Sequence, residues 1–253
     1  MHTEKQEFST IFVIQARMGS VRLPGKILIP AFEGKSILDI VTGRLQERFP
    51  HIPLYIASGP EKDNAALGAW AAGKNIQVTW GSENDVLSRF RTLAEQTGAA
   101  YLVRICADNP FLDMDYLQEL LDAAAEDPAE YIAQRVNGTP SIRTHLGLYC
   151  ELVSGPALRH KMSDLSPENC EHVTSYMYGE GREHFRIHWV EHHWPQEVLH
   201  SLRLSVDTPG DMEMAAELFA RTHGDIRRVI PYVLEERPDM ALKMSEQIEK
   251  YKK

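Results

Sequence analysis

Short apolar runs alternate with helical segments through the first half of the chain, and this alternation constrains the fold more than any other feature. Apolar runs of four to six residues predict strands, and segments with an apolar stripe at helical spacing predict helices. Strands joined through single helices run parallel, because each crossover returns the chain to the same end of the sheet. The sequence therefore predicts an α/β fold with a doubly wound, mostly parallel sheet. The expected strands are residues 11–16, 54–57, 77–80 and 101–106, and the expected helices are residues 36–49, 63–73, 85–97 and 113–127.

The alternation stops between about residues 131 and 196. Alternating runs at residues 147–153 and 185–190 stand among helical pieces there, which indicates an antiparallel insertion able to carry a partner interface. We expect residues 202–206 to return to the sheet as a further strand, followed by helices over residues 211–222 and 225–235. The whole chain, residues 1–253, is interpreted as one domain with residues 131–196 as an insertion subdomain.

Composition narrows the classes of function. The net charge of -9 provides no global field that would draw the protein to nucleic acid or to a membrane surface. No apolar run approaches the roughly 20 residues that cross a bilayer. Cys106, Cys150 and Cys170 are odd in number and widely spaced, which fits a reducing compartment. We therefore expect a cytoplasmic protein that binds neither nucleic acid nor membranes, and not a disulfide scaffold or a zinc finger.

A basic loop follows the first expected strand. Arg17, Arg22 and Lys26 lie within ten positions, and Gly19 and Gly25 stand among them. Ligands of open α/β sheets bind beyond the carboxyl ends of the strands, which is where this loop begins. Arginine donates two hydrogen bonds to a phosphate, and glycine allows a close approach to backbone N–H groups. The loop predicts a triphosphate site, although it matches neither the Walker A pattern nor GxGxxG. A solvated basic turn is the alternative.

Two aspartates follow expected strands. Asp108 comes after the strand at residues 101–106, and Asp207 comes after the one at residues 202–206. If both strands are parallel to the first, the two carboxylates share its edge and can hold a hard divalent cation such as Mg²⁺ beside a triphosphate. Alternatively, Asp207 caps a helix ahead of Pro209, and Asp108 is a turn residue ahead of Pro110.

Residues 15–28 have the sequence QARMGSVRLPGKIL, which resembles the signature of the cytidylyltransferase family that includes the spore-coat polysaccharide biosynthesis proteins. That family is related to the synthetases of CMP-linked 3-deoxy-manno-octulosonate and CMP-linked neuraminate. Further blocks of the family are matched in order along the chain. They lie at residues 80–87, 103–113, 171–174 and 202–211.

The resemblance implies the nucleotide-diphospho-sugar transferase fold and transfer of CMP from CTP, with Mg²⁺ and loss of pyrophosphate. The implied acceptor is an acidic sugar or a related anionic metabolite for a surface polymer. A homodimer is implied as well, in which the insertion takes part in dimerisation and acceptor binding. The implied catalytic residues are Arg17, Lys26 and Asp108, and the implied metal ligands are Asp108 and Asp207.

The resemblance also assigns binding residues. The nucleotide would contact Gln15, Ala16, Arg17, Met18, Gly19, Ser20, Arg22, Lys26, Ser58, Ser82, Asp85, Arg104 and Asp108. The acceptor would contact Arg143, Tyr149, Glu151 and His172.

The chain departs from the family pattern at two places. Cys106 and Ala107 precede Asp108 where the family usually has Thr and Gly, and Tyr149 stands where the family has an acidic residue. A nucleotidyltransferase for another triphosphate and a catalytically weak nucleotide-sugar-binding or glycosyltransferase-like protein therefore remain alternatives. The histidines between residues 184 and 193 match no metal-binding spacing, so a solvated or interface strand is favoured there.

Overall fold

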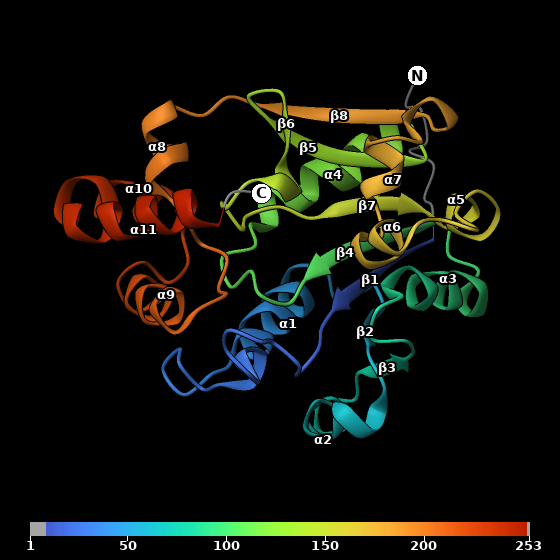
Figure 1. Ribbon diagram of the computed structural model, residues 1–253, viewed down its shortest axis with the longest axis horizontal. Coiled ribbons are helices and arrows are strands. Elements are labelled where there is room, and N and C mark those ends of the chain that lie inside the picture. The colour runs from blue at the N-terminus through green and yellow to red at the C-terminus, as the bar shows by residue number, and fades with distance from the viewer. Residues whose placement is uncertain (1–8, 252–253) are drawn as a thin grey trace.

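The computed structural model describes residues 9–251, which form one mixed sheet with helices on both faces (Figure 1). The sheet has eight strands in the order β3-β2-β1-β4-β7-β5-β6, and β8 pairs with β5. The first four strands are mutually parallel, with β1 between β2 and β4. The strands are β1 Thr10–Gln15, β2 Leu54–Ser58, β3 Gln77–Trp80, β4 Tyr101–Cys106, β5 Tyr131–Val136, β6 Thr139–Pro140, β7 Glu151–Ser154 and β8 Ile187–His192.

Helices connect the parallel strands and make up most of the C-terminal part of the chain. The α-helices are α1 Ile37–Arg48, α2 Ala65–Gly73, α3 Val86–Thr97, α4 Met114–Glu126, α5 Gly155–His160, α6 Pro167–His172, α7 Ser175–Tyr178, α8 Gln196–Ser201, α9 Pro209–Thr222, α10 Ile226–Pro231 and α11 Pro238–Lys250. Short 3-10 helices cover Lys26–Leu28, Glu61–Asp63, Ser141–Arg143 and Arg182–His184, and a π-helix covers Tyr232–Glu236.

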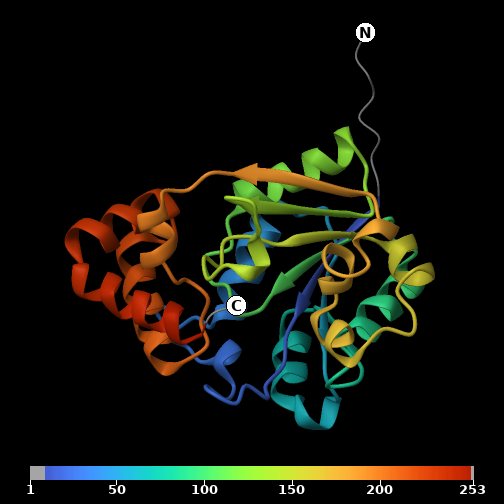
Figure 2. The same cartoon turned by 45° about the horizontal axis from the view of Figure 1, so that its top comes forward.

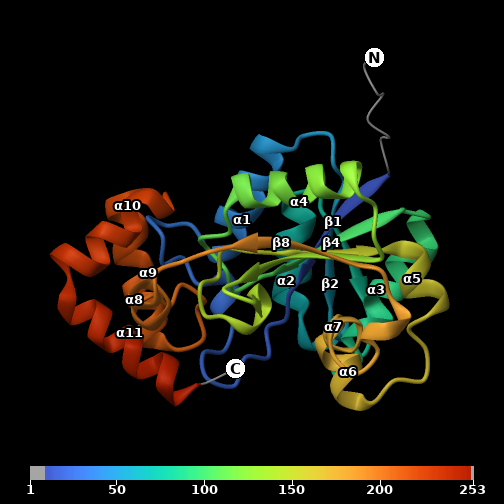
Figure 3. The ribbon, with the colours of Figure 1, turned by 90° about the horizontal axis from the view of Figure 1, so that it is seen from above.

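Side chains of β1 alternate between two apolar cores. Phe12 and Ile14 pack in the core that α1 and α4 cover, and Ile11 and Val13 pack in the core that α3 and α5 cover. Figure 3 shows these helix pairs on opposite faces of the sheet. Because both faces are buried, the strand appears in the sequence as a continuous apolar run. The parallel half predicted from the sequence is confirmed, with element ends shifted by two residues or fewer.

Residues 131–196 extend the same sheet. β7 lies between β4 and β5 and runs antiparallel to both, as expected of this region. β8, however, pairs with β5 in parallel. The expected runs at residues 147–153 and 185–190 correspond to β7 and β8, which both begin later along the chain.

The strand predicted at residues 202–206 is wrong. The backbone of this segment forms only isolated bonds, with Leu204 N–H donating to His145 O (3.0 Å) and Val206 N–H donating to Asp108 O (2.9 Å). Leu202, Leu204 and Val206 are buried in the same core as residues of α9 and α11. Residues 202–206 are apolar in keeping with their burial under these helices. Apolarity alone does not distinguish such a segment from a strand.

Helices α8–α11 stack beside one end of the sheet (Figure 2). The helix predicted over residues 225–235 is divided between α10 and the π-helix, and the helix expected from residue 211 already begins at Pro209. Thr208 caps α9 in a capping box with Asp211. Within residues 9–251, none of the helices has the length and apolarity needed to cross a membrane.

Candidate active site

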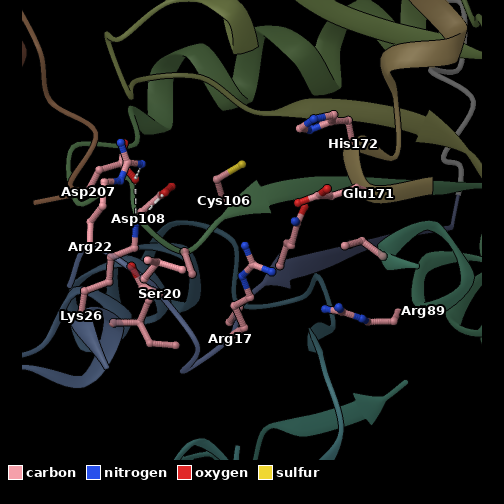
Figure 4. A pocket seen from close by; sticks show the side chains of 16 residues that line it. Arg17, Ser20, Arg22, Lys26, Arg89, Cys106, Asp108, Glu171, His172 and Asp207 are labelled. Atoms are coloured by element: carbon pink, nitrogen blue, oxygen red, sulfur yellow. Dashed lines mark hydrogen bonds and ion pairs between the residues drawn. The ribbon is translucent and has the colours of Figure 1, made fainter. Parts of the chain in front are cut away.

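A cavity of about 410 Å³ opens at the carboxyl ends of β1 and β4 (Figure 4). Figure 4 shows Arg22, Lys26, Asp108 and Asp207 gathered at one end of it, with Glu171 and His172 at the other. The residues that line it are Gln15, Ala16, Arg17, Ser20, Val21, Arg22, Lys26, Ile27, Val86, Arg89, Cys106, Ala107, Asp108, Glu171, His172 and Asp207.

The loop after β1 is held in place by backbone contacts. Met18 N–H donates to Oδ1 of the buried Asn64 (2.8 Å), and Gly25 N–H donates to Met18 O (3.0 Å). Gly25 adopts a left-handed conformation with φ 69°, which glycine tolerates without a steric penalty. These contacts fold the loop back over the strand end, so that Arg17 and Lys26 both face the cavity.

Lys26 lies between the two predicted metal ligands. Its Nζ donates to Asp108 Oδ2 (3.0 Å), Asp207 Oδ1 (3.0 Å) and Val206 O (2.6 Å). An ammonium group has three donors, so these contacts engage all of them. Burial lowers the pKa of Lys26, but the two carboxylates outweigh burial and raise it above its ordinary value. The side chain is therefore charged at neutral pH.

Asp207 is surrounded by cations. Arg22 Nη2 lies 3.0 Å from Oδ1, and Arg203 Nη2 donates to Oδ2 at 3.0 Å. Burial raises the pKa of Asp207, but Lys26 and the two arginines outweigh it and hold that pKa below its ordinary value. Asp207 is therefore ionised at neutral pH, which a metal-binding role requires of its carboxylate.

The fully buried Arg203 holds Asp207 from the side that faces the protein interior. Arg203 donates to Asp211 Oδ1 (2.9 Å) and Oδ2 (3.0 Å), and its Nη1 lies 2.5 Å from His145 Nδ1. Asp211 Oδ2 also accepts from the backbone N–H groups of Asp207 (3.0 Å) and Thr208 (2.9 Å). The N-terminus of α9 and the Asp207 carboxylate are thus held by one network.

Arg89 of α3 lines the cavity opposite the basic loop. Its Nε donates to Ser82 O and its Nη2 donates to Glu83 O, both at 2.8 Å. Glu83 in turn forms an exposed ion pair with Arg17 at 3.3 Å. Arg89 therefore orders the turn between β3 and α3, and the Glu83 side chain links that turn to the basic loop.

A strained turn brings residues 171–174 to the cavity. Val173 has φ 58° and ψ -61°, and Thr174 N–H donates to His172 O (2.6 Å), which defines a γ-turn. A β-branched residue with positive φ is costly, and such strain concentrates at functional sites. The turn directs Glu171 and His172 into the cavity, while Thr174 donates to Glu151 Oε1 (2.9 Å) on the sheet.

A buried ion pair lies between β4 and β7. Arg104 donates to Glu151 Oε2 through Nη1 and to Gln15 Oε1 through Nε (3.0 Å). Glu151 also accepts from the hydroxyls of Tyr131 and Thr174. Both members of the pair are buried, so they fix the relative positions of β1, β4 and β7 beneath the cavity.

A smaller cavity of about 110 Å³ adjoins the first and shares Cys106 and Asp108 with it. Tyr149 lines it, stacks on Tyr116 with ring centroids 4.9 Å apart, and accepts a hydrogen bond from Trp194 Nε1 (2.9 Å). The remaining lining residues are Asn109, Ser141, Ile142, Thr144 and Gly147.

The structure gathers many of the predicted site residues around the large cavity and leaves others apart. Those that line it are Gln15, Ala16, Arg17, Ser20, Arg22, Lys26, Asp108, His172 and Asp207. Those that do not are Met18, Gly19, Ser58, Ser82, Asp85, Arg104, Arg143, Tyr149 and Glu151. Asp85 instead caps α3, Ser58 is buried in β2, and Arg143 is exposed. The roles assigned to all these residues stay predictions.

Sequence reasoning left out several residues that line or support the site, among them Asn64, Arg89, Glu171 and Arg203. Asn64 and Arg89 follow the second and third strands, where a lone polar residue carries no recognisable pattern. Arg203 did carry a signal, because it is a charged residue inside the apolar run at residues 202–206 and lies four and eight residues before two aspartates. A charge in such a run requires a buried partner.

The donor set fits a hard divalent cation. Asp108 and Asp207 each place a carboxylate oxygen on the same ammonium group, and oxygen is the ligand that Mg²⁺ prefers. Among residues 9–251, no cluster of three or more acidic, histidine or cysteine side chains could hold a metal ion. The two carboxylates of Asp108 and Asp207 would suit a cation that takes its remaining ligands from phosphates and water.

Comparison with known proteins defines the class. Residues 11–145 match the family described as cytidylyltransferase. The chain is 30% identical over 219 residues to the spore coat polysaccharide biosynthesis protein SpsF of Bacillus subtilis (strain 168), covering 83% of this chain and 86% of that protein. The chain therefore belongs to the cytidylyltransferase family. As a member of it, the protein is a CTP-using nucleotidyltransferase.

Solved structures share the fold. A cytidylyltransferase from Leptospira borgpetersenii serovar Hardjo-bovis (strain JB197) superposes with a TM-score of 0.77 at 24% identity, covering 93% of this chain and 97% of that one. The CMP:2-keto-3-deoxy-manno-octonic acid synthetase, solved in complex with CTP, superposes with a TM-score of 0.59 at 17% identity, covering 84% and 98%. The predicted fold class, a Rossmann-like nucleotidyltransferase sheet, is confirmed.

Proposed function

We propose that this protein transfers CMP from CTP to an oxygen of an acidic sugar, or of a related anionic metabolite, with release of pyrophosphate. The observation that carries the proposal is the cavity itself, which brings Arg17, Arg22 and Lys26 together with Asp108 and Asp207 at the carboxyl ends of β1 and β4. Three cations of an otherwise acidic protein thus lie together where they can neutralise a triphosphate.

In the proposed reaction, the acceptor oxygen forms a bond to the α-phosphorus in line with the bond to pyrophosphate, which breaks. Transfer of this kind depends mainly on positioning and charge stabilisation. Arg22 and Lys26, which both contact Asp207, would give up those contacts for phosphate oxygens. Arg17 at the mouth of the cavity would neutralise further charge on the phosphates.

Asp108 and Asp207 are the residues that would hold Mg²⁺. When bound, the ion would supply positive charge to the phosphates during transfer. Asp108 is suited to this role because its side chain is 30% exposed to the cavity while its backbone O is fixed by Val206 N–H. Arg203 would keep Asp207 in position from its buried side.

The acceptor would lie across the cavity from the basic loop. His172 provides a ring N–H that can donate to an anionic group there, and the smaller cavity beside Cys106 and Tyr149 offers hydroxyl and amide groups for a polyol. Similarity to a spore coat polysaccharide biosynthesis protein supports a surface polymer as the destination of the product. Arg143 and Glu151 lie outside both cavities, so the acceptor contacts proposed here centre on His172 and Tyr149.

The region 131–196 supports a proposal on assembly. In the described part of the chain β8 pairs only with β5, so its outer edge presents unpaired backbone groups. We propose a homodimer in which this region lies at the interface. Light scattering of the purified protein tests it, and a monomer at micromolar concentration would refute it.

The activity is tested by pyrophosphate release with Mg²⁺, each of the four nucleoside triphosphates, and a panel of acidic sugars, sugar phosphates and phosphonates. Release that requires CTP and one acceptor is expected. Lys26→Met and Asp108→Asn should abolish release, while the control Lys74→Met, which alters a lysine paired with Asp39 elsewhere, should leave it intact. Silence across the panel, with no stabilisation by any triphosphate, would favour a catalytically weak binding protein.

A further inference from the structure

Tyr251, the last residue that the structure describes, lies against the basic end of the cavity. The guanidinium carbon of Arg22 is 4.7 Å from the centroid of its ring, and that of Arg203 is 5.7 Å from it. Lys250 Nζ lies 5.2 Å from the same centroid. The ring therefore contacts a cation of the proposed triphosphate site and the buried arginine that supports Asp207.

Helix α11 delivers this ring to the site. Met240 and Met244 are buried, and Met244 Sδ accepts from Arg203 N–H at 3.5 Å. Tyr251 N–H then donates to Gln247 O (3.0 Å), which continues the helical bonding by one residue. The position of the ring is thus tied to the packing of α11 on the segment that carries Arg203.

Arg22 has two contacts of different kinds. Its Nη2 forms an ion pair with Asp207 Oδ1 at 3.0 Å, and the ring of Tyr251 contacts the guanidinium. An arriving phosphate also binds the N–H edges, so it competes with Asp207. A cation is attracted to an aromatic ring by the charge distribution of the ring, so this contact needs no hydrogen-bond acceptor that would compete with a phosphate. The contact with Tyr251 can persist whichever donors a phosphate takes, whereas the contact with Asp207 must yield to a phosphate that binds the same Nη2.

We propose that Tyr251 is a positioning residue of the triphosphate site, which holds Arg22 in its phosphate-binding orientation through the contact between its ring and the guanidinium. This inference rests on the proposed function, since it assumes that Arg22 binds the triphosphate. The ring restricts the orientation of a side chain that is 42% exposed on a loop, so less conformational freedom is lost when CTP binds.

The test is a double-mutant cycle on CTP binding, measured by titration calorimetry with Mg²⁺ and without acceptor. Tyr251→Ala should raise the dissociation constant of CTP about three- to tenfold, the range of a cation–π contact at a partly exposed site. Tyr251→Phe retains the ring and should restore binding to within about twofold. In the Arg22→Ala background, Tyr251→Ala should have no further effect, because the ring acts through Arg22.

A matched control removes another tyrosine of the C-terminal helices. Tyr232 donates to Glu217 and lines a separate surface groove, so Tyr232→Ala should leave CTP binding unchanged. Thermal unfolding of every variant verifies that it is folded. Equal losses from Tyr251→Ala with and without Arg22 would overturn the proposal, as would an unchanged dissociation constant. If Arg22→Ala itself leaves CTP binding unchanged, the triphosphate role of Arg22 fails, and the proposed function must be revised at that residue.

Discussion

Replacing Arg203 by methionine should destabilise the protein far more than replacing Arg22, although both arginines contact the carboxylate of Asp207. Arg203 is fully buried and holds Asp211, itself 1% exposed, through two hydrogen bonds of 2.9 and 3.0 Å. Removing one partner of a buried pair leaves an uncompensated charge, which costs about 3–5 kcal/mol. The pair formed by Arg22 is 42% exposed on the arginine side, and exposed pairs contribute about 0.2–1 kcal/mol.

Urea unfolding at pH 7, monitored by circular dichroism, measures the unfolding free energy of each variant. We expect Arg203→Met to lower the unfolding free energy by about 3–5 kcal/mol with the slope against urea unchanged, and Arg22→Met to lower it by about 1 kcal/mol or less. Arg203→Lys keeps the charge but not the planar fork, so it should fall between the two. A value for Arg203→Met within about 1 kcal/mol of wild type would refute the view that this network is a buried, mutually dependent unit.

Three further outcomes are expected. Glu151→Gln leaves Arg104 buried without its counter-ion and should lower the unfolding free energy by about 3 kcal/mol in urea; an unchanged value would show that the pair contributes nothing. Burial raises the pKa of Asp207, but neighbouring cations lower it below its ordinary value of 3.8, so its stabilising effect is present above that pH and is lost as the pH falls below it. Acid unfolding should therefore be steeper in the wild type than in Asp207→Asn, and equal slopes would contradict this. Asn64→Leu removes the acceptor of Met18 N–H and should raise the dissociation constant of CTP roughly tenfold in calorimetry, whereas unchanged affinity would show that the loop holds its shape without it.

Local patterns were sufficient for the parallel half of the sheet. The strand β1 is buried on both faces, and the crossover helix α1 begins at Ile37, where Ser36 and Asp39 form a capping box within a few residues of sequence. The end of β1 also predicted where the basic loop lies, because ligands of parallel sheets bind at the carboxyl ends of their strands. Each of these features depends on residues that are close together along the chain, so each can be predicted from the sequence.

Contacts between distant segments were decided by the tertiary structure alone. Residues 202–206 have the apolarity of a strand, but packing under α9 and α11 determined their conformation, and Asp207 still reached the edge predicted for it. The arrangement in which Lys26 lies between Asp108 and Asp207 depends on three loops meeting, and no local pattern encodes their distance.

The amino-acid sequence by itself determined the fold class, the basic loop and the two aspartates, because hydrophobic period and residue chemistry are local properties. Only the tertiary structure decided that Arg203 supports Asp207, that Arg104 and Glu151 pair beneath the cavity, and that Tyr251 reaches Arg22. The physical reason is that a buried charge is stable only beside its partner, and the chain can supply that partner from any distance along its length.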